Sequence, residues 1–176
     1  MLSKLIPSGS FLTQIAATGL IGTIGDAICQ TVVEKRSKYD AIRTLRFGLI
    51  LTGFVGPFQY VWFRFLARNI GRPGESSFIT GVKRMAVDQS VAAPIITSAF
   101  LFFADLAEKP HDVNRSIDKT KSLIGPVLIN NYKLWPAVQI INMSLVPLHF
   151  RVVVVQFVAV FWNMYISYTI NKKPTE

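Results

Sequence analysis

The distribution of charged residues constrains this chain most, because it leaves five long windows without Asp, Glu, Lys or Arg. The windows cover residues 5–25, 47–63, 89–104, 134–150 and 152–171. A bilayer core about 30 Å thick requires about 20 helical residues, and arginine side chains at the ends of a shorter window can extend to the headgroups. The windows therefore predict helices that cross a membrane. A soluble bundle of buried helices is the alternative, which the length and apolar composition of the windows disfavour.

The predicted fold class is all-α, a polytopic membrane protein with a bundle of about four transmembrane helices plus amphipathic or interfacial helices. We expect a single membrane domain over residues 1–176, with spans at approximately 11–33, 46–67, 84–107 and 148–170. The hydrophobic stretch before the last span is too long for one crossing, so residues 134–146 are expected to form an interfacial or kinked segment. Residues 105–133 carry charges of alternating sign, which predicts a solvated helix or hairpin.

Small residues and prolines mark the predicted spans. A stripe of small side chains lets a second helix approach closely, and the first span carries one at Thr18, Gly22, Gly25 and Cys29. The second and third spans contain Pro57 and Pro94. Proline usually kinks a membrane helix, and neighbouring groups can satisfy the freed carbonyl.

The composition excludes several functional classes and suggests partners. The single cysteine excludes an intramolecular disulfide and a cysteine metal cluster, and we expect no cofactor. The net charge is +9, yet a mean hydropathy of +0.38 is too apolar for a nucleic-acid-binding domain. Basic residues are expected on both membrane faces, which would suit anionic lipids or small anionic solutes such as nucleotides. A solvated surface is the alternative.

Charged residues inside the predicted spans are the leading candidates for a functional site, because each costs at least about 2.5 kcal/mol in a bilayer. They are Asp26, Asp88 and Arg151. Neutral polar residues accompany them at helical spacing: Gln89, Gln139, Asn142, His149, Gln156 and Asn163. These residues either face a hydrated path or form hydrogen bonds between helices, and both interpretations stay open. Four helices enclose little volume, so a pore would require a homo-oligomer or a tight path within the chain.

Signatures of enzymes are absent from the sequence. It contains no G-x-x-x-x-G-K-[ST] loop, no G-x-S-x-G elbow and no H-E-x-x-H zinc motif, so we expect neither an enzyme nor a metal site. Cys29 is a candidate for redox gating, and its alternative role is packing within the small-residue stripe.

A set of residues at fixed spacing resembles the signature of the Mpv-seventeen / peroxisomal-membrane-protein-twenty-two family. Residues 131–151 read N-Y-x-x-W-P-x-x-Q-x-x-N-x-x-x-V-P-x-x-x-R, and Trp162, Asn163 and Ser167 follow. Earlier matches extend the resemblance to roughly residues 25–167: Gly25, Asp26, Gln30, Gly56, Pro57, Trp62, Lys83, Asp88, Gln89 and Pro94. The sequences L-W-P-A-V-Q and V-P-L-H are more similar to the mitochondrial branch than to the peroxisomal branch. The chain departs from the family pattern at Tyr60, Phe63 and Met143.

The resemblance implies a four-span protein of the mitochondrial inner membrane. It further implies a weakly selective channel that influences membrane potential, reactive-oxygen balance, and the maintenance of mitochondrial DNA and deoxynucleotides. The alternatives are a non-conducting structural or assembly factor of that membrane and a peroxisomal-membrane pore of the same family. The family supplies no catalytic residues to carry over.

Overall fold

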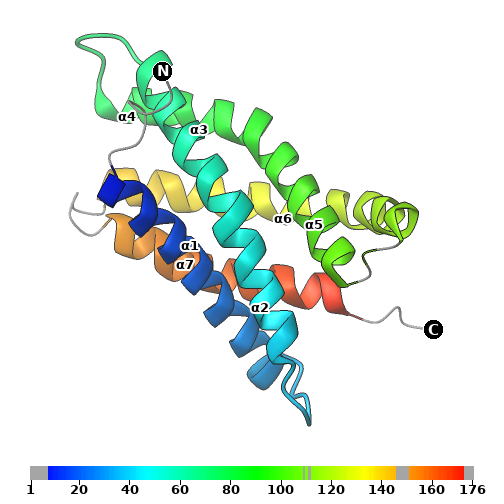
Figure 1. The fold of residues 1–176 in the computed structure, drawn as a ribbon. Coiled ribbons are helices and arrows are strands. Elements are labelled where there is room, and N and C mark those ends of the chain that lie inside the picture. The colour runs from blue at the N-terminus through cyan, green and yellow to red at the C-terminus, as the bar shows by residue number, and fades with distance from the viewer. Residues whose placement is uncertain (1–7, 109, 111, 146–150, 173–176) are drawn as a thin grey trace. The chain divides into compact units, whose positions relative to one another are not determined.

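The structure, a computed structural model, describes residues 8–108, 110, 112–145 and 151–172 (Figure 1). These residues form helices and connecting turns, and none of them lies in a strand. The prediction of an all-α chain is therefore confirmed. Within the described residues, three helical runs are long and apolar enough to cross a membrane: Phe11–Val33, Ala41–Asn69 and Ser77–Glu108. The number of four spans stays a prediction.

The first helical run consists of α1 (Ser8–Ile28) and the π-helical turn η2 (Cys29–Val33). It ends where the N–H of Glu34 donates to the carbonyl of Cys29 at 2.9 Å. The next residue, Lys35, has a φ of 48°, in the left-handed region that reverses the chain direction. The run therefore ends where the sequence predicts the end of the first span.

The second and third runs each contain a π-helical turn that ends two residues before a proline. The second joins α2 (Ala41–Ile50), η3 (Leu51–Val55) and α3 (Gly56–Asn69). The third joins α4 (Ser77–Val87), η4 (Asp88–Ala92) and α5 (Ala93–Glu108). A proline ring would clash with the carbonyl four residues earlier, which belongs to Gly53 for Pro57 and to Ser90 for Pro94. Both carbonyls lie in π turns, whose wider hydrogen-bond pattern accommodates the ring.

The last two helices are α6 (Val113–Leu145) and α7 (Arg151–Asn171). The carboxylate of Asp112 caps α6 by accepting from the N–H of Arg115 at 3.0 Å. The helix continues through Pro126 and Pro136. It thus contains most of the predicted solvated segment and residues 134–145 of the predicted interfacial or kinked segment. Residues 146–150 lie outside the described residues.

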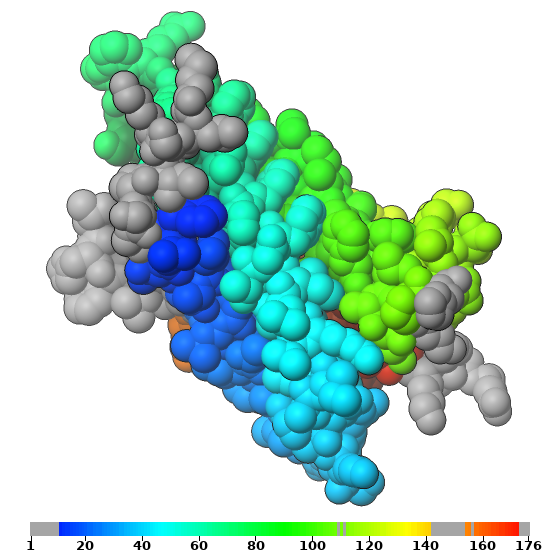
Figure 2. All heavy atoms as spheres, in the orientation of Figure 1, coloured from blue at the N-terminus to red at the C-terminus, as the bar shows by residue number. Residues whose placement is uncertain are grey.

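The chain divides into two compact units. Unit 1 comprises residues 1–62 and 160–176, and in it α1 packs against α2 and η3. Figure 1 shows α1 and α2 side by side, and their atoms adjoin in Figure 2. Of the predicted small-residue stripe, Gly22 lies at this contact, where an added Cβ would stand 1.8 Å from Leu51 Cδ1, whereas Gly25 faces α7. The small residues therefore permit the close approach.

Unit 2 comprises residues 63–159, and in it α5 packs along α6 while α4 contacts η4 and α6. Buried apolar side chains of this unit include Leu66, Ala92, Phe100, Leu101 and Val127. Because only a short connection separates α5 from α6, these packed neighbours run antiparallel.

Large apolar side chains remain exposed along the candidate spans. Leu20 is 62% exposed, Leu49 60% and Val61 64%. Soluble proteins rarely expose apolar surface of this extent, whereas lipid tails accommodate it. The exposure pattern is that of a membrane protein.

Candidate functional site

The centre of the candidate site in unit 1 is Asp26, whose side chain is fully buried in α1. Its Oδ1 accepts hydrogen bonds from Arg43 Nε at 2.9 Å and from Ser167 Oγ. Its Oδ2 accepts from Gln30 Nε2 at 2.9 Å and from Thr44 Oγ1. We call these five residues the buried polar cluster. Four donors satisfy both carboxylate oxygens, which offsets the cost of removing the charge from water.

Arg43 links Asp26 to a second carboxylate at the edge of the cluster. Its Nη1 and Nη2 donate to Glu34 Oε2 at 2.9 Å and to Oε1 at 2.8 Å, the bidentate geometry that suits a guanidinium. Arg36 Nε lies 2.8 Å from Glu34 Oε2 on the exposed side. The two carboxylates and the two guanidinium groups balance in charge. The hydrogen bond from Arg43 holds the pKa of Glu34, one residue beyond the first span, below its ordinary value.

Hydrogen bonds from Gln30 connect the buried polar cluster to the chain that precedes α2. Its Nε2 also donates to Thr44 Oγ1 and to the carbonyl of Asp40, each at 3.0 Å. Its Oε1 accepts from the N–H of Asp40 at 2.8 Å. Tyr39 completes this network, because its hydroxyl donates to Thr44 Oγ1 at 2.8 Å. The side chain of Gln30 thus replaces backbone partners where the chain reverses direction.

The positions of these residues follow from local sequence. Asp26 and Gln30 are four residues apart and share one face of the helical run. Arg43 lies in the first turn of α2, which Asp40 caps by accepting from the Arg43 N–H at 3.0 Å. Ser167 approaches from α7 because Gly25 has no side chain: an added Cβ would lie 2.7 Å from Asn163 Cβ. One carboxylate therefore joins α1, α2 and α7.

The cluster can stabilise the fold, and it leaves Asp26 little capacity to bind a solute. Each carboxylate oxygen of Asp26 accepts two hydrogen bonds. The guanidinium of Arg43 donates hydrogen bonds to Asp26, Glu34 and Ser167. The described hydrogen bonds of Asp26 thus run to its own helical run, to α2 and to α7.

A second buried carboxylate lies in unit 2, where the sequence pattern predicts a solvated segment. Asp105 is only 1% exposed. Its Oδ1 accepts from Lys119 Nζ at 2.8 Å, and its Oδ2 accepts from Ser116 Oγ at 2.9 Å and Arg115 Nη1 at 3.1 Å. Asp105 is buried rather than solvated because α5 continues to Glu108 and the first two turns of the antiparallel α6 pack against α5.

Asp88 and Gln89, two further predicted site residues, lie half-buried in η4. Gln89 Nε2 donates to Asp88 Oδ2 at 3.0 Å. Gln89 Oε1 and Asn131 Oδ1 are buried and have no hydrogen-bond partner among the described residues. Both acceptors belong to unit 2.

The other predicted site residues are spread over the last two helices. Gln139 lies half-buried on α6, and Asn163 lies half-buried on α7 beside Gly25. His149 lies outside the described residues. For three residues the structure describes only the helical backbone: Asn142, Arg151 and Gln156.

Cys29, the predicted redox candidate, is fully buried at the edge of the buried polar cluster. Its Sγ lies 3.4 Å from Glu34 Oε1 and 3.8 Å from Arg43 Nη2. Across the described part of the chain, no group of three or more His, Cys, Asp or Glu side chains is arranged to hold a metal ion.

Sequence reasoning did not include five residues of this network among the site residues: Gln30, Glu34, Arg43, Thr44 and Ser167. Glu34 and Arg43 lie between two charge-free windows, where charged residues are ordinarily assigned to the membrane surface. The available signal was the spacing of Asp26 and Gln30, which places two polar side chains on one helical face next to a short turn.

Comparisons with known proteins identify a family and several relatives. The sequence model of the Mpv17 / PMP22 family matches residues 107–167. Similar curated proteins include the mitochondrial inner membrane protein Mpv17 of Drosophila melanogaster, 37% identical over 84% of this chain and 88% of the relative. Mpv17 of Bos taurus is 38% identical over 90% and 89%, and protein SYM1 of Gibberella zeae is 39% identical over 89% and 88%. No solved structure matches the chain.

The relatives are similar over most of their length, and several are named as inner-membrane proteins of mitochondria. The chain itself has helices that are long and apolar enough to span that membrane. It is a protein of the mitochondrial inner membrane and belongs to the Mpv17 / PMP22 family.

Proposed function

We propose that this protein is a weakly selective channel of the mitochondrial inner membrane, and not an enzyme. Its conductance would act on membrane potential, reactive-oxygen balance, and the maintenance of mitochondrial DNA and deoxynucleotides. The solutes proposed are small ions and nucleotides, and the conducting form is a homo-oligomer or a tight path within one chain.

The observation that carries this proposal is the pair of unpartnered acceptors in unit 2. Gln89 Oε1 and Asn131 Oδ1 are buried, with no donor among the described residues. Leaving a polar group without a hydrogen bond in an apolar interior costs about 2–7 kcal/mol. Water inside the unit would supply the missing donors, and polar groups in a span are tolerated where they line a hydrated space.

The two acceptors lie at similar depth in unit 2. Ser116 on α6 is bonded to Asp105 on α5, which fixes the register of the antiparallel pair. Gln89 precedes Asp105 by 16 residues, and Asn131 follows Ser116 by 15. At about 1.5 Å per residue, both stand roughly 23 Å from this anchor. A continuous hydrated path would serve both groups.

Recording from planar bilayers that contain the purified protein tests the proposal. The wild type is expected to conduct, and the double variant Gln89→Leu/Asn131→Leu is expected to conduct less, because it removes two groups that hold water. Gln14→Leu is the matched control, since Gln14 is an exposed amide on α1. A wild type that passes neither ions nor labelled nucleotides at any voltage or redox condition refutes the proposal.

A second candidate function, a non-conducting structural or assembly factor, is favoured by the buried polar cluster. Buried charges that pair with each other are what a structural role requires, and Asp26 is paired with Arg43. This function predicts that exchanging the two charges, Asp26→Arg with Arg43→Asp, restores folding lost in each single variant while no flux appears. Flux through the wild type separates the two functions.

A further inference from the structure

The turn between α3 and α4 carries a marked excess of positive charge. In residues 64–87, Glu75 is the single acidic residue, and the basic residues are Arg64, Arg68, Arg72, Lys83 and Arg84. Two candidate spans end here, one at Asn69 and the other at Ser77. Residues 70–76 therefore lie at a membrane surface, at the depth of lipid headgroups.

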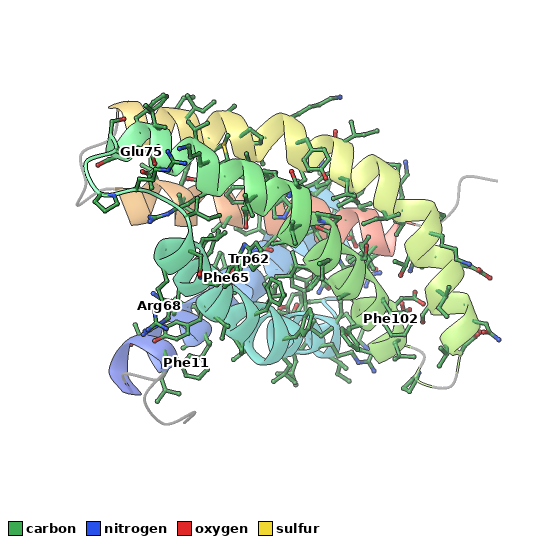
Figure 3. All side chains as sticks on the ribbon, turned by 90° about the horizontal axis from the view of Figure 1, so that it is seen from above. Phe11, Trp62, Phe65, Arg68, Glu75 and Phe102 are labelled. Carbon is green, nitrogen blue, oxygen red and sulfur yellow. The ribbon has the colours of Figure 1, made fainter. Side chains whose placement is uncertain are left out.

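The one acidic side chain of this segment is already engaged. Glu75, labelled in Figure 3 in the chain that leads into α4, accepts hydrogen bonds from Lys83 Nζ and, at 2.9 Å, from Thr80 Oγ1. The hydrogen bond from Lys83 lowers the pKa of Glu75 and keeps it ionised. Glu75 is thus paired with Lys83 and forms no ion pair with Arg68 or Arg72 among the described residues.

The turn is held in shape by contacts between its two ends. Arg84 donates from Nε to the carbonyl of Ile70 and from Nη2 to the carbonyl of Ala67, each at 3.0 Å. Its charge is thereby placed at the end of α3, where helix carbonyls attract a cation. Gly71 adopts a φ of 124°, and an added Cβ would lie 2.9 Å from Thr80 Cγ2. A ligand at this surface would not have to order the backbone.

Two exposed arginines remain available on this turn. Arg68 and Arg72 form no ion pair within the described part of the chain, and in Figure 3 Arg68 stands apart from Glu75. Large apolar side chains are exposed on both sides of them, with Phe65 at 49% and Phe78 at 48%. Guanidinium groups suit phosphate, and exposed aromatic rings next to them suit the adjoining acyl region.

We propose that the α3–α4 turn is a binding site for an anionic phospholipid, with Arg68 and Arg72 contacting the headgroup phosphate. The α1–α2 turn differs in its charge balance. Its exposed Lys35 and Lys38 stand close in sequence to Glu34 and Asp40, and Arg36 pairs with both carboxylates. Two carboxylates therefore offset part of the positive charge of that turn, whereas the single carboxylate of the α3–α4 turn is paired with Lys83.

Lipid-dependent thermal stability of the purified full-length protein in neutral detergent tests the site. Phosphatidylglycerol is titrated, with phosphatidylcholine as the neutral lipid and inorganic phosphate as the free anion. The wild type is expected to melt at higher temperature with phosphatidylglycerol alone. In Arg68→Gln/Arg72→Gln the apparent affinity should fall roughly fivefold for each arginine, or about twenty-five-fold for the pair, as expected for a cation near an anionic surface.

Two further variants make the result specific. Lys35→Asn/Lys38→Gln removes the same charge from the other turn, with Asn chosen because it tolerates the left-handed backbone of residue 35, and should retain the wild-type affinity. Arg68→Lys/Arg72→Lys keeps the charge and should bind within about threefold of the wild type. The Lys variant also tests the site if the Gln variant does not fold. A folded Lys variant that no longer prefers phosphatidylglycerol to phosphatidylcholine would contradict the proposal.

Three outcomes would overturn the assignment. In the first, the folded Gln variant binds phosphatidylglycerol as tightly as the wild type. In the second, the control at Lys35 and Lys38 weakens binding equally. In the third, inorganic phosphate raises the melting temperature as much as the lipid does, which identifies a soluble anion as the occupant. Channel recordings do not enter this test, so its outcome is independent of the proposed function.

Discussion

Arg43 and Ser167 stand 124 positions apart in the sequence, and Arg43 Nη2 donates a hydrogen bond of 2.7 Å to Ser167 Oγ. Ser167 in turn donates to Asp26, so its hydroxyl both accepts and donates inside the cluster. The bond ties the end of α7 to the α1–α2 hairpin within unit 1. Residues from both ends of the chain are therefore needed to satisfy one buried carboxylate.

Replacing Arg43 by Met is expected to destabilise the protein by about 3–5 kcal/mol, because Asp26 and Glu34 would lose their cation. Denaturant unfolding in detergent measures the change. Arg46→Met is the control, since Arg46 lies one turn later on α2 and is exposed. The double variant Asp26→Leu/Arg43→Met should recover part of the loss. An Arg43→Met protein as stable as the wild type would contradict the role assigned to the pair.

Replacing Ser167 by Ala is expected to cost about 1–3 kcal/mol, because it removes a donor to Asp26 and an acceptor for Arg43 in a buried site. The same substitution at Ser122 should cost less than about 0.5 kcal/mol, since that exposed hydroxyl bonds only to a carbonyl of its own helix. Equal losses from the two variants in an unfolding titration would be incompatible with the network described.

Replacing Gly25 by Ala is expected to destabilise unit 1 by about 1–3 kcal/mol. The new Cβ would lie 3.0 Å from the carbonyl oxygen of Val160 and 3.2 Å from the backbone nitrogen of Met164, and backbone atoms cannot rotate away. Gly53→Ala is the matched control, because a Cβ there meets no atom within 4 Å. Melting temperatures of both variants measure the effect. A Gly25 variant that melts at the same temperature as the Gly53 variant would contradict close packing of α1 on α7.

Acid should weaken the contribution of Glu34 to stability. Its pKa is lowered from 4.5 in the folded protein, chiefly by the hydrogen bond from Arg43. The unfolded chain therefore binds a proton at a pH where the folded chain does not, so the stabilisation is present above about pH 4.5 and is lost as the pH falls through the folded pKa. The gap in melting temperature between the wild type and Glu34→Gln should close on acidification. A gap that stays constant, or that persists in an Arg43→Met background, would argue against this coupling.

The helices and their membrane character were predictable because a long window without charged residues indicates a segment in contact with lipid. The first span follows from such a window, and Asp26 follows from the cost of a charge within the predicted span 11–33. The run Val113–Leu145 was not predictable in one piece, because its charged first half and apolar second half predict different environments. Its two prolines also argue locally for interruption, which tertiary packing overrides.

The partners of the buried carboxylates were beyond sequence reasoning for a different reason. Arg43 and Lys119 look like ordinary surface cations by composition, and only the chain path brings them to Asp26 and Asp105. In the same way, Ser167 gains its role from a helix far away in the sequence. Pairing of this kind depends on register and crossing geometry, which a single sequence does not encode locally.

The π turns change how each long span should be mapped. A π turn holds one extra residue, and one residue of α-helix corresponds to about 100° of rotation. The side chains before Leu51–Val55 and those after it therefore follow two different angular phases, and Asp88–Ala92 divides the third run in the same way. A cysteine or tryptophan scan that fits one helical period to the whole of Ala41–Asn69 would assign half of the span to the wrong face. Each segment needs its own fit.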